Sequence, residues 1–240
     1  MAKKEACQEG PFWQDGPLGQ KGQNGPFDIH PGVELGAQVQ GPREPASAGT
    51  RFVMVKERHR KTFETALLQG KVDGQMQALC MFIARTKGFY TSSCCSGRII
   101  LLEKKGGRKI DTFFHRKWHR KITLDELAQG LEEKTVGEIW LKVDPFILHI
   151  GCGSLEDASK ILAAMKKAGV KRGGIIVAGP GKFMVELQGT EKMDVPVKKG
   201  ETVFADGRYL AHLTENANAL LEKNYARLEK LGQEFRKALK

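Results

Sequence analysis

One short segment of the sequence, residues 90–98, is dense in groups that bind anions. Its sequence is Tyr-Thr-Ser-Ser-Cys-Cys-Ser-Gly-Arg, so hydroxyl and thiol groups lie beside a glycine and an arginine. Hydroxyls and free backbone N–H groups in a turn bind carboxylate or phosphate oxygens, and the planar guanidinium of Arg98 adds a bidentate contact. The segment lies between a predicted helix and a predicted hairpin, where we expect a turn. By composition alone it also fits an ordinary polar turn with a surface arginine.

A second segment, residues 116–121, suits phosphate contact and base stacking. It places five basic or titratable side chains around one tryptophan. Lysine and arginine neutralise backbone phosphates, and an aromatic ring stacks on bases. The alternative is a solvated basic loop without a ligand. The residues predicted to bind RNA are Arg116, Lys117, Trp118, Arg120 and Lys121.

Residues 146–154 partly fit the glycine turn by which common methyltransferases bind S-adenosylmethionine. That turn needs glycines for close backbone approach and an acidic residue at the end of the next strand. Here Leu155 occupies the third glycine position, and the next predicted strand ends at Ala178 without an acid. We therefore interpret the segment as a strand that turns tightly into a capped helix, and we do not expect a Rossmann-like fold.

Metal and thiol chemistry are weakly supported by the spacing of the ligand-type residues. His115 and His119 have the i, i+4 spacing of a helical metal pair, but the sequence around them predicts a strand and shows no third ligand. Cys94 and Cys95 are adjacent and do not form a Cys-x-x-Cys pair. We predict that the protein holds no metal and has no redox-active thiol pair.

The composition of the chain limits the classes of protein to which it can belong. Of its 240 residues 40% are hydrophobic and 28% are charged, which is typical of a globular protein. Lys and Arg exceed Asp and Glu by 39 − 28 = 11, so nucleic acid is the first partner to consider. No apolar run is long enough to cross a bilayer and no apolar core follows the first residues, so we expect neither a membrane span nor a signal peptide. The five cysteines do not resemble a secreted disulfide framework, so we expect a cytoplasmic protein.

The first fifty residues differ in composition from the rest. They hold six of the nine prolines and nine of the 28 glycines, and four basic against six acidic residues leave +11 + 2 = +13 on residues 51–240. Their apolar residues follow neither helix nor strand periodicity. We predict that residues 1–53 are a disordered tail, or an upstream stretch before a true start at Met54. Residues 54–240 would then form one α+β catalytic domain.

The remaining sequence predicts short helices and hairpins around one long C-terminal helix. Thr123 with Glu126 forms a capping box, and Ser154 caps a helix that ends at Gly169. The strands gather in hairpins, which favours an α+β fold of mixed or antiparallel sheets with flanking helices. We expect helices over 63–67, 72–83, 123 onward, 154–169 and 210–235, and strands over 98–102, 110–114, 138–150, 174–178, 182–188 and a pair that turns at 206–207.

The order of residues in the 90–98 segment closely resembles the tRNA wybutosine-synthesis methyltransferase family, in particular its archaeal members. Family members show Tyr-Thr-Thr-Ser-Ser-Cys-Ser-Gly-Arg, preceded by a Gly-x-Val-Asp helix start that matches residues 70–73. The resemblance covers about residues 54–240. Cys94 stands where the family has its second serine, and Ala84 where it usually has asparagine. Further matches lie at 117–119, 145–149, 168–171, 185–186, 196 and 217–218.

The resemblance implies an S-adenosylmethionine-dependent enzyme that methylates ring nitrogen N4 of a demethylwyosine with an aminocarboxypropyl arm, beside the anticodon of phenylalanine tRNA. It also implies a fold unlike that of common methyltransferases. The alternatives are a non-catalytic basic RNA-binding protein and a thiol or metal enzyme.

Methyl transfer to a ring nitrogen needs in-line positioning and an acceptor for the nitrogen's proton. The candidates for proton transfer are Asp73, His119 and His149, although Asp73 also fits a helix N-cap and His149 a buried core position. The candidates for binding substrate or cofactor are Ser93, Cys95, Ser96, Arg98 and Glu186.

Overall fold

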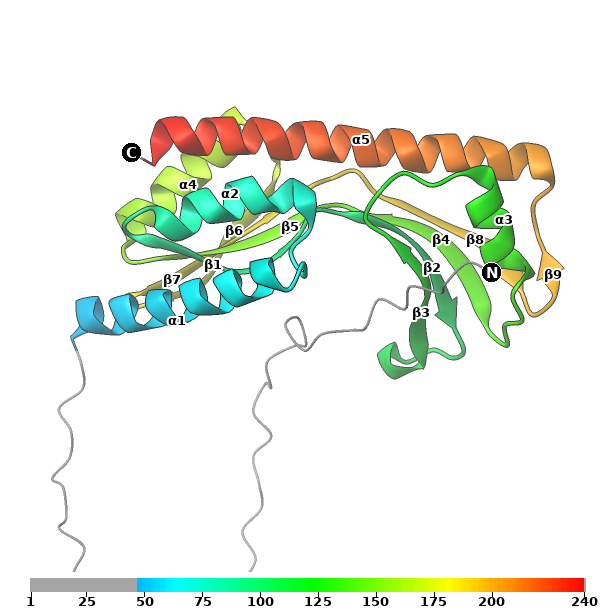
Figure 1. The fold of residues 1–240 in the computed structure, drawn as a ribbon, viewed down its shortest axis with the longest axis horizontal. Coiled ribbons are helices and arrows are strands. Elements are labelled where there is room, and N and C mark those ends of the chain that lie inside the picture. The colour runs from blue at the N-terminus through cyan, green and yellow to red at the C-terminus, as the bar shows by residue number, and fades with distance from the viewer. Residues whose placement is uncertain (1–46, 240) are drawn as a thin grey trace, which may run out of the picture. The chain divides into compact units, whose positions relative to one another are not determined.

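The computed structural model describes residues 47–239, which form five α-helices and nine strands (Figure 1). The helices are α1 (Ala48–Leu68), α2 (Gly74–Arg85), α3 (Leu124–Glu132), α4 (Leu155–Lys167) and α5 (Gly207–Ala238). The strands are β1 (Phe89–Cys95), β2 (Arg98–Lys104), β3 (Thr112–Trp118), β4 (Glu138–Asp144), β5 (Ile147–Cys152), β6 (Arg172–Gly179), β7 (Lys182–Gln188), β8 (Met193–Lys199) and β9 (Thr202–Val203). The predicted α+β class is confirmed.

The first described helix, α1, begins at Ala48, six residues before the predicted boundary at residue 54. Met54 lies within α1, and Phe52 on the same helix is buried. The ring of Phe52 lies 5.7 Å from that of Tyr90 on β1. Residues 48–53 therefore pack with the domain. The predicted disorder of residues 1–46 concerns a segment outside the described residues.

The first sheet has the strand order β1-β5-β7-β6 and is antiparallel throughout. Its residues alternate between two faces, as strand geometry requires. Leu148, Ile150, Val185 and Leu187 are fully buried on one face, where α2 and α4 pack. Figure 1 shows α1 on the opposite face. The interleaved positions of β5 and β7 bring polar side chains to this second face.

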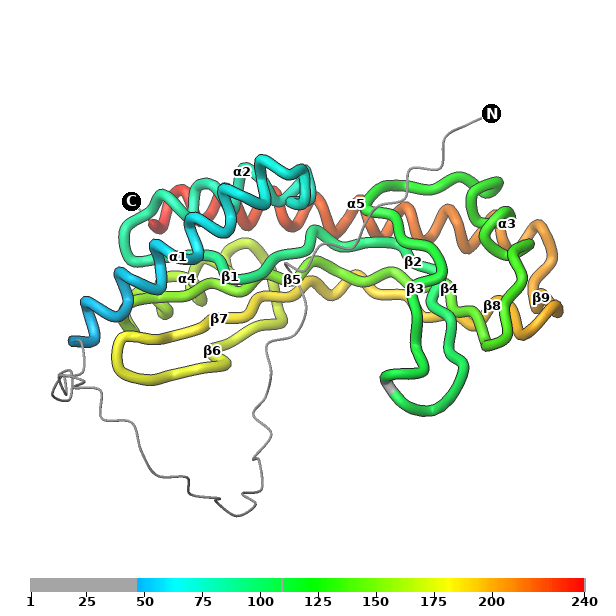
Figure 2. The backbone as a smooth tube through the Cα atoms, turned by 60° about the horizontal axis from the view of Figure 1, so that its bottom comes forward, coloured from blue at the N-terminus to red at the C-terminus, as the bar shows by residue number. Residues whose placement is uncertain are grey.

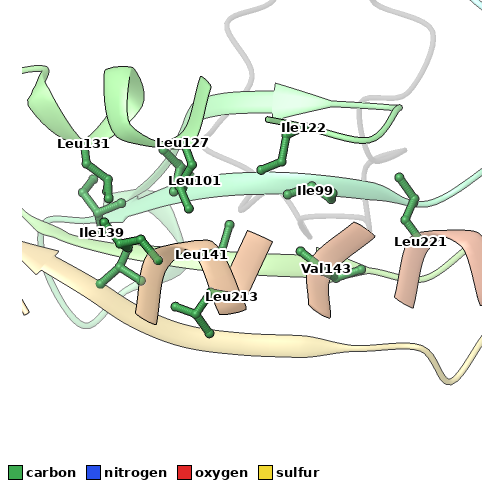
Figure 3. Close-up of a cluster of buried hydrophobic side chains, with 13 residues drawn as sticks. Ile99, Leu101, Ile122, Leu127, Leu131, Ile139, Leu141, Val143, Leu213 and Leu221 are labelled. Carbon is green, nitrogen blue, oxygen red and sulfur yellow. The ribbon is translucent and has the colours of Figure 1, made fainter. Parts of the chain in front are cut away.

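The second sheet has the strand order β3-β2-β4-β8-β9. Its inner face holds the buried cluster of Figure 3, in which Ile99, Leu101, Leu141 and Val143 of the sheet pack against α3 and α5. The alternate residues of β4 point to the other face. Among the described residues, no helix covers that other face (Figure 1).

Three short links connect strands of the two sheets, β1 to β2, β4 to β5 and β7 to β8, as Figure 2 shows. The links are residues 96–97, 145–146 and 189–192. The fully buried Asn224 of α5 joins them, because its Oδ1 accepts from the backbone N–H of Phe146 at 2.7 Å and its Nδ2 donates to the carbonyl of Ser96 at 2.6 Å. A side chain at Gly97 or Gly189 would collide with this amide, within 3.0 Å. One buried side chain thus fixes the junction of the two sheets.

Local capping signals were predicted correctly at two helices and misinterpreted at a third. Thr123 forms the capping box with Glu126, and Ser154 caps α4. The turn predicted at Asp206–Gly207 is wrong, because Asp206 caps α5 through a bond from the Tyr209 N–H. An Asp-Gly pair suits both a hairpin and a helix start, and the helix that follows decides between them. The described residues contain no helix long and apolar enough to span a membrane.

Candidate active site

The segment predicted to form a turn is mostly the edge strand β1. Pairing with β5 supplies backbone partners that no local pattern predicts, and Tyr and Thr suit an extended chain. Ser93 and Cys95 face one side of the strand and Cys94 the other. The Cys94 thiol contacts Cys80 of α2, and this contact together with burial raises its pKa. The departure from the family's serine is therefore directed toward α2, away from the face that Ser93 occupies.

Ser93, His149 and Glu186 form a continuous hydrogen-bonded chain across three strands. The register of the first sheet places them side by side on β1, β5 and β7. Ser93 Oγ lies 2.6 Å from His149 Nδ1, and His149 Nε2 lies 2.7 Å from Glu186 Oε2. If the serine hydroxyl donates to Nδ1, Nε2 carries the ring proton and donates it to the carboxylate. The His149 and Glu186 side chains remain partly exposed, so the chain is accessible to a substrate.

Asp73 lies at the start of α2 but does not cap it with its side chain. Its carboxylate instead accepts hydrogen bonds from the backbone N–H of Ser96 at 2.8 Å and from the Ser96 hydroxyl at 3.0 Å. His119 Nδ1 lies 3.1 Å from the same oxygen. The Tyr225 hydroxyl donates to the backbone carbonyl of His119 at 2.9 Å and thereby holds this segment in place.

Asp73 and His119 form a charged pair at neutral pH. The Asp73 carboxylate, with a smaller effect of Cys95, raises the pKa of His119 from 6.5 to about 9. Burial alone would raise the pKa of Asp73, but His119 and Ser96 lower it. An imidazolium has no free lone pair, and a carboxylate of lowered pKa is a weak base. The pair is therefore suited to orient and neutralise bound groups, and His149 is the better candidate for a proton acceptor.

Possible metal ligands lie close together beside Asp73, but they are not the pair His115 and His119 that the sequence spacing suggested. Single ligand atoms of Asp73, Cys95 and His119 lie within 4.8 Å of one another. His115 is not part of the group, because its Nε2 lies 2.8 Å from the carbonyl oxygen of Gly130. The three side chains could hold a divalent cation such as Zn²⁺. The expected absence of a metal stays a prediction.

Arg98 begins β2 on the face of the second sheet that α5 does not cover. Its Nε donates to Asp144 at 3.2 Å, and its guanidinium carbon lies 4.6 Å from the centroid of the Phe114 ring. Within the described residues its two Nη groups form no other ion pair, so they are available to a carboxylate or phosphate. The bidentate contact expected from the sequence stays a prediction.

The basic segment 116–121 is distributed over two faces of the sheet. Arg116 pairs with Glu133, Arg120 with Glu126 and Lys121 with Glu222. Trp118 packs against the buried cluster of the second sheet, which disfavours its predicted role in base stacking. Lys117 is different, because it faces outward and lies 5.6 Å from the Phe114 ring. RNA binding by the other residues of the segment stays a prediction.

Comparison with known proteins identifies the family. Residues 54–237 match the family described as Methyltransferase TYW3. The chain belongs to this family. The resemblance stated from the sequence and the expected class of enzyme, a methyltransferase in wyosine biosynthesis, are both confirmed.

Relatives in the family span archaea and animals. The chain is 32% identical over 183 residues to tRNA(Phe) 7-((3-amino-3-carboxypropyl)-4-demethylwyosine(37)-N(4))-methyltransferase 1 of Thermococcus kodakarensis, covering 76% of this chain and 92% of that protein. It is 30% identical to the tRNA wybutosine-synthesizing protein 3 homolog of Danio rerio, covering 71% of this chain and 69% of that protein. The fold is similar to that of the PH1069 protein from Pyrococcus horikoshii, with a TM-score of 0.73 and 31% identity over 78% of this chain and 97% of that one.

Three residues of the site region escaped the sequence analysis. Asn224 and Tyr225 lie on α5, far along the chain from the groups they contact, and nothing in the periodicity of a long amphipathic helix singles them out. Phe114 was assigned to a strand without a role. The sequence signal for Phe114 is the pair of adjacent phenylalanines next to a basic run. Neighbouring residues of a strand point to opposite faces, so only one of the two rings can face the buried cluster.

Proposed function

We propose that this TYW3 family member transfers a methyl group from S-adenosylmethionine to ring nitrogen N4 of a demethylwyosine that carries an aminocarboxypropyl arm, next to the anticodon of phenylalanine tRNA. The named relatives support the substrate. The observation in this chain that carries the chemistry is the Ser93–His149–Glu186 chain, which can accept the proton that N4 must lose.

The side chains around β1 suit both the cofactor and the substrate arm. The cofactor and the substrate arm each contain a carboxylate and an ammonium group. Arg98 would hold a carboxylate through its Nη groups, and the Glu186 carboxylate would hold an ammonium. When bound, S-adenosylmethionine supplies a methyl group on a positively charged sulfur. The Asp73–His119 pair would position a polar group of either molecule beside Ser96.

The protein's own residues provide a path for one proton. The Ser93 hydroxyl donates to His149 Nδ1, so its oxygen is free to accept the N4–H proton as its own proton moves to the imidazole. The resulting imidazolium is stabilised by Glu186, 2.7 Å from Nε2. The carboxylate fixes the ring tautomer and need not itself become protonated. Proton loss balances the positive charge that N4 gains with the methyl group.

The proposal is tested with tRNA from a strain that lacks the enzyme. Incubation with the protein and S-adenosylmethionine should add one methyl group to the wyosine precursor, as detected by mass spectrometry of nucleosides. His149→Ala should lower turnover by about 100-fold or more while it keeps cofactor binding, since general-base catalysis contributes about 10²–10⁴-fold. The control His212→Ala removes a histidine of α5 bonded to Asn216 and should keep full activity.

Two results would contradict the proposal. If His149→Ala methylates tRNA as fast as the wild type, His149 is not the proton acceptor. Binding of tRNA without any binding of S-adenosylmethionine would instead support the alternative, a non-catalytic RNA-binding protein.

A further inference from the structure

The face of the second sheet opposite the buried cluster carries two aromatic rings in one row. Phe114 on β3 pairs with Leu102 on β2, and Leu102 pairs with Trp140 on β4. Neighbouring strands lie about 4.8 Å apart, so the two ring-bearing positions are about 10 Å apart across the sheet. We call Phe114, Trp140 and the cations around them the aromatic row.

Each ring of the aromatic row has a cation beside it. Lys104 Nζ lies 3.6 Å from the Trp140 ring centroid. Arg98 and Lys117 approach the Phe114 ring at 4.6 and 5.6 Å. Lysines and arginines around flat, accessible rings are the combination that single-stranded nucleic acids require, because the rings stack on bases and the cations contact phosphates.

The aromatic row leaves one apolar ring open to solvent. Phe114 is 47% exposed on the edge strand of the sheet, although burial of a phenylalanine ring is favourable. The acidic groups on this face are already engaged, Asp144 with Arg98, Asp194 with Lys142, and Glu138 with the indole N–H of Trp140 at 2.7 Å. In the described residues, Lys104 and Lys117 form no ion pair with an acidic side chain, so they can compensate phosphate charge. This arrangement fits a polyanionic partner and not an apolar one.

We propose that the aromatic row binds the single-stranded nucleotides that flank the modified base of the RNA, by stacking their bases on Phe114 and Trp140. A base on Trp140 takes the place of Lys104 over the ring, and a phosphate becomes the new partner of that ammonium group. Arg98 connects the row to the candidate active site, since it contacts Phe114 and begins the strand that follows Ser96. The inference rests on the proposed function, because it takes the RNA substrate from there.

The test measures affinity for a fluorescein-labelled anticodon stem-loop of phenylalanine tRNA by anisotropy. Each ring supplies one stacking platform for a base, so Phe114→Ala and Trp140→Leu should each weaken binding by about 10-fold. Phe113→Ala is the matched control. Phe113 is the neighbouring residue, equally exposed at 48%, but it points to the opposite face of β3. It should stay within about twofold of the wild type.

A further variant separates stacking from folding. Phe114→Leu keeps an apolar side chain but removes the π-face, and it should lose nearly as much affinity as Phe114→Ala. Lys117→Gln should reduce the salt dependence of binding by about one counterion, whereas Lys61→Gln on α1 should not. Full affinity in Phe114→Leu, or equal losses in Phe113→Ala and Phe114→Ala, would overturn the proposal.

Methylation and binding by the wild type distinguish a failure of this inference from a failure of the proposed function. A wild-type protein that methylates tRNA, with Phe114→Ala binding as well as the wild type, would refute the aromatic row alone. A wild-type protein that binds the stem-loop through Phe114 but neither binds S-adenosylmethionine nor methylates would refute the proposed function alone. No measurable binding of the stem-loop or of whole tRNA would refute both.

Discussion

The Asp73–His119 pair predicts a specific pH dependence of stability. His119 titrates at about 9 in the folded protein and near 6.5 when unpaired. Each pKa unit corresponds to about 1.4 kcal/mol, so the pair stabilises the fold by at most about 3 kcal/mol. The His119 side chain is 32% exposed, and solvent screening lowers this figure to about 1–2 kcal/mol. Because the folded pKa is raised, the full stabilisation is present below pH 6.5 and is lost as the pH rises through 9.

Asp73→Asn is the perturbation that isolates this effect. The amide keeps an oxygen to accept from Ser96 but removes the charge that holds the proton on His119. Urea unfolding should show that the wild type is more stable than the variant. This difference in the free energy of unfolding should be about 1–2 kcal/mol larger at pH 6 than at pH 10.

A control variant is measured by the same urea unfolding at pH 6 and pH 10. Asp144→Asn removes the partner of Arg98, whose charge does not change in this range, so its cost should be the same at pH 6 and pH 10. NMR should place the titration of His119 near 9 in the wild type and near 6.5 in Asp73→Asn. A His119 that titrates near 6.5 in the wild type, or a stability difference that does not vary with pH, would contradict the predicted effect of the pair.

Four further outcomes are expected. Glu186→Gln should lower methyl-transfer turnover by about 10-fold or more with little change in melting temperature, measured under single-turnover conditions. Arg98→Lys keeps the charge but loses the planar fork, and steady-state kinetics should show at least a tenfold loss, about 1.4 kcal/mol. A truncation that begins at Met54 should lose about 2–3 kcal/mol on chemical unfolding, because it removes the buried Phe52, whereas one that begins at residue 47 should not. Asn224→Ala should destabilise by about 2–4 kcal/mol in the same assay, because it leaves buried backbone groups without partners.

Much of the secondary structure followed from the sequence because its causes are local. The capping box at Thr123 and the cap at Ser154 involve groups three residues apart, and the long amphipathic pattern of α5 repeats every three or four residues. Hairpin-rich sheets and the absence of a Rossmann-like turn also followed from short patterns. The order of residues 90–98 was sufficient to point to the family, and it predicts that the serines and the arginine of this segment belong to the site.

Tertiary structure alone decided which of the candidate residues meet. Ser93 and His149 are 56 positions apart, and His149 and Glu186 are 37 apart, so only the register of three strands brings them into one chain. The same pairing made residues 89–95 a strand where local composition predicted a turn. The basic neighbours of Trp118 predict contact with RNA, yet the alternation of β3 turns its ring toward the buried cluster. Contacts over such separations depend on how the whole chain packs, and no local pattern of residues contains that information.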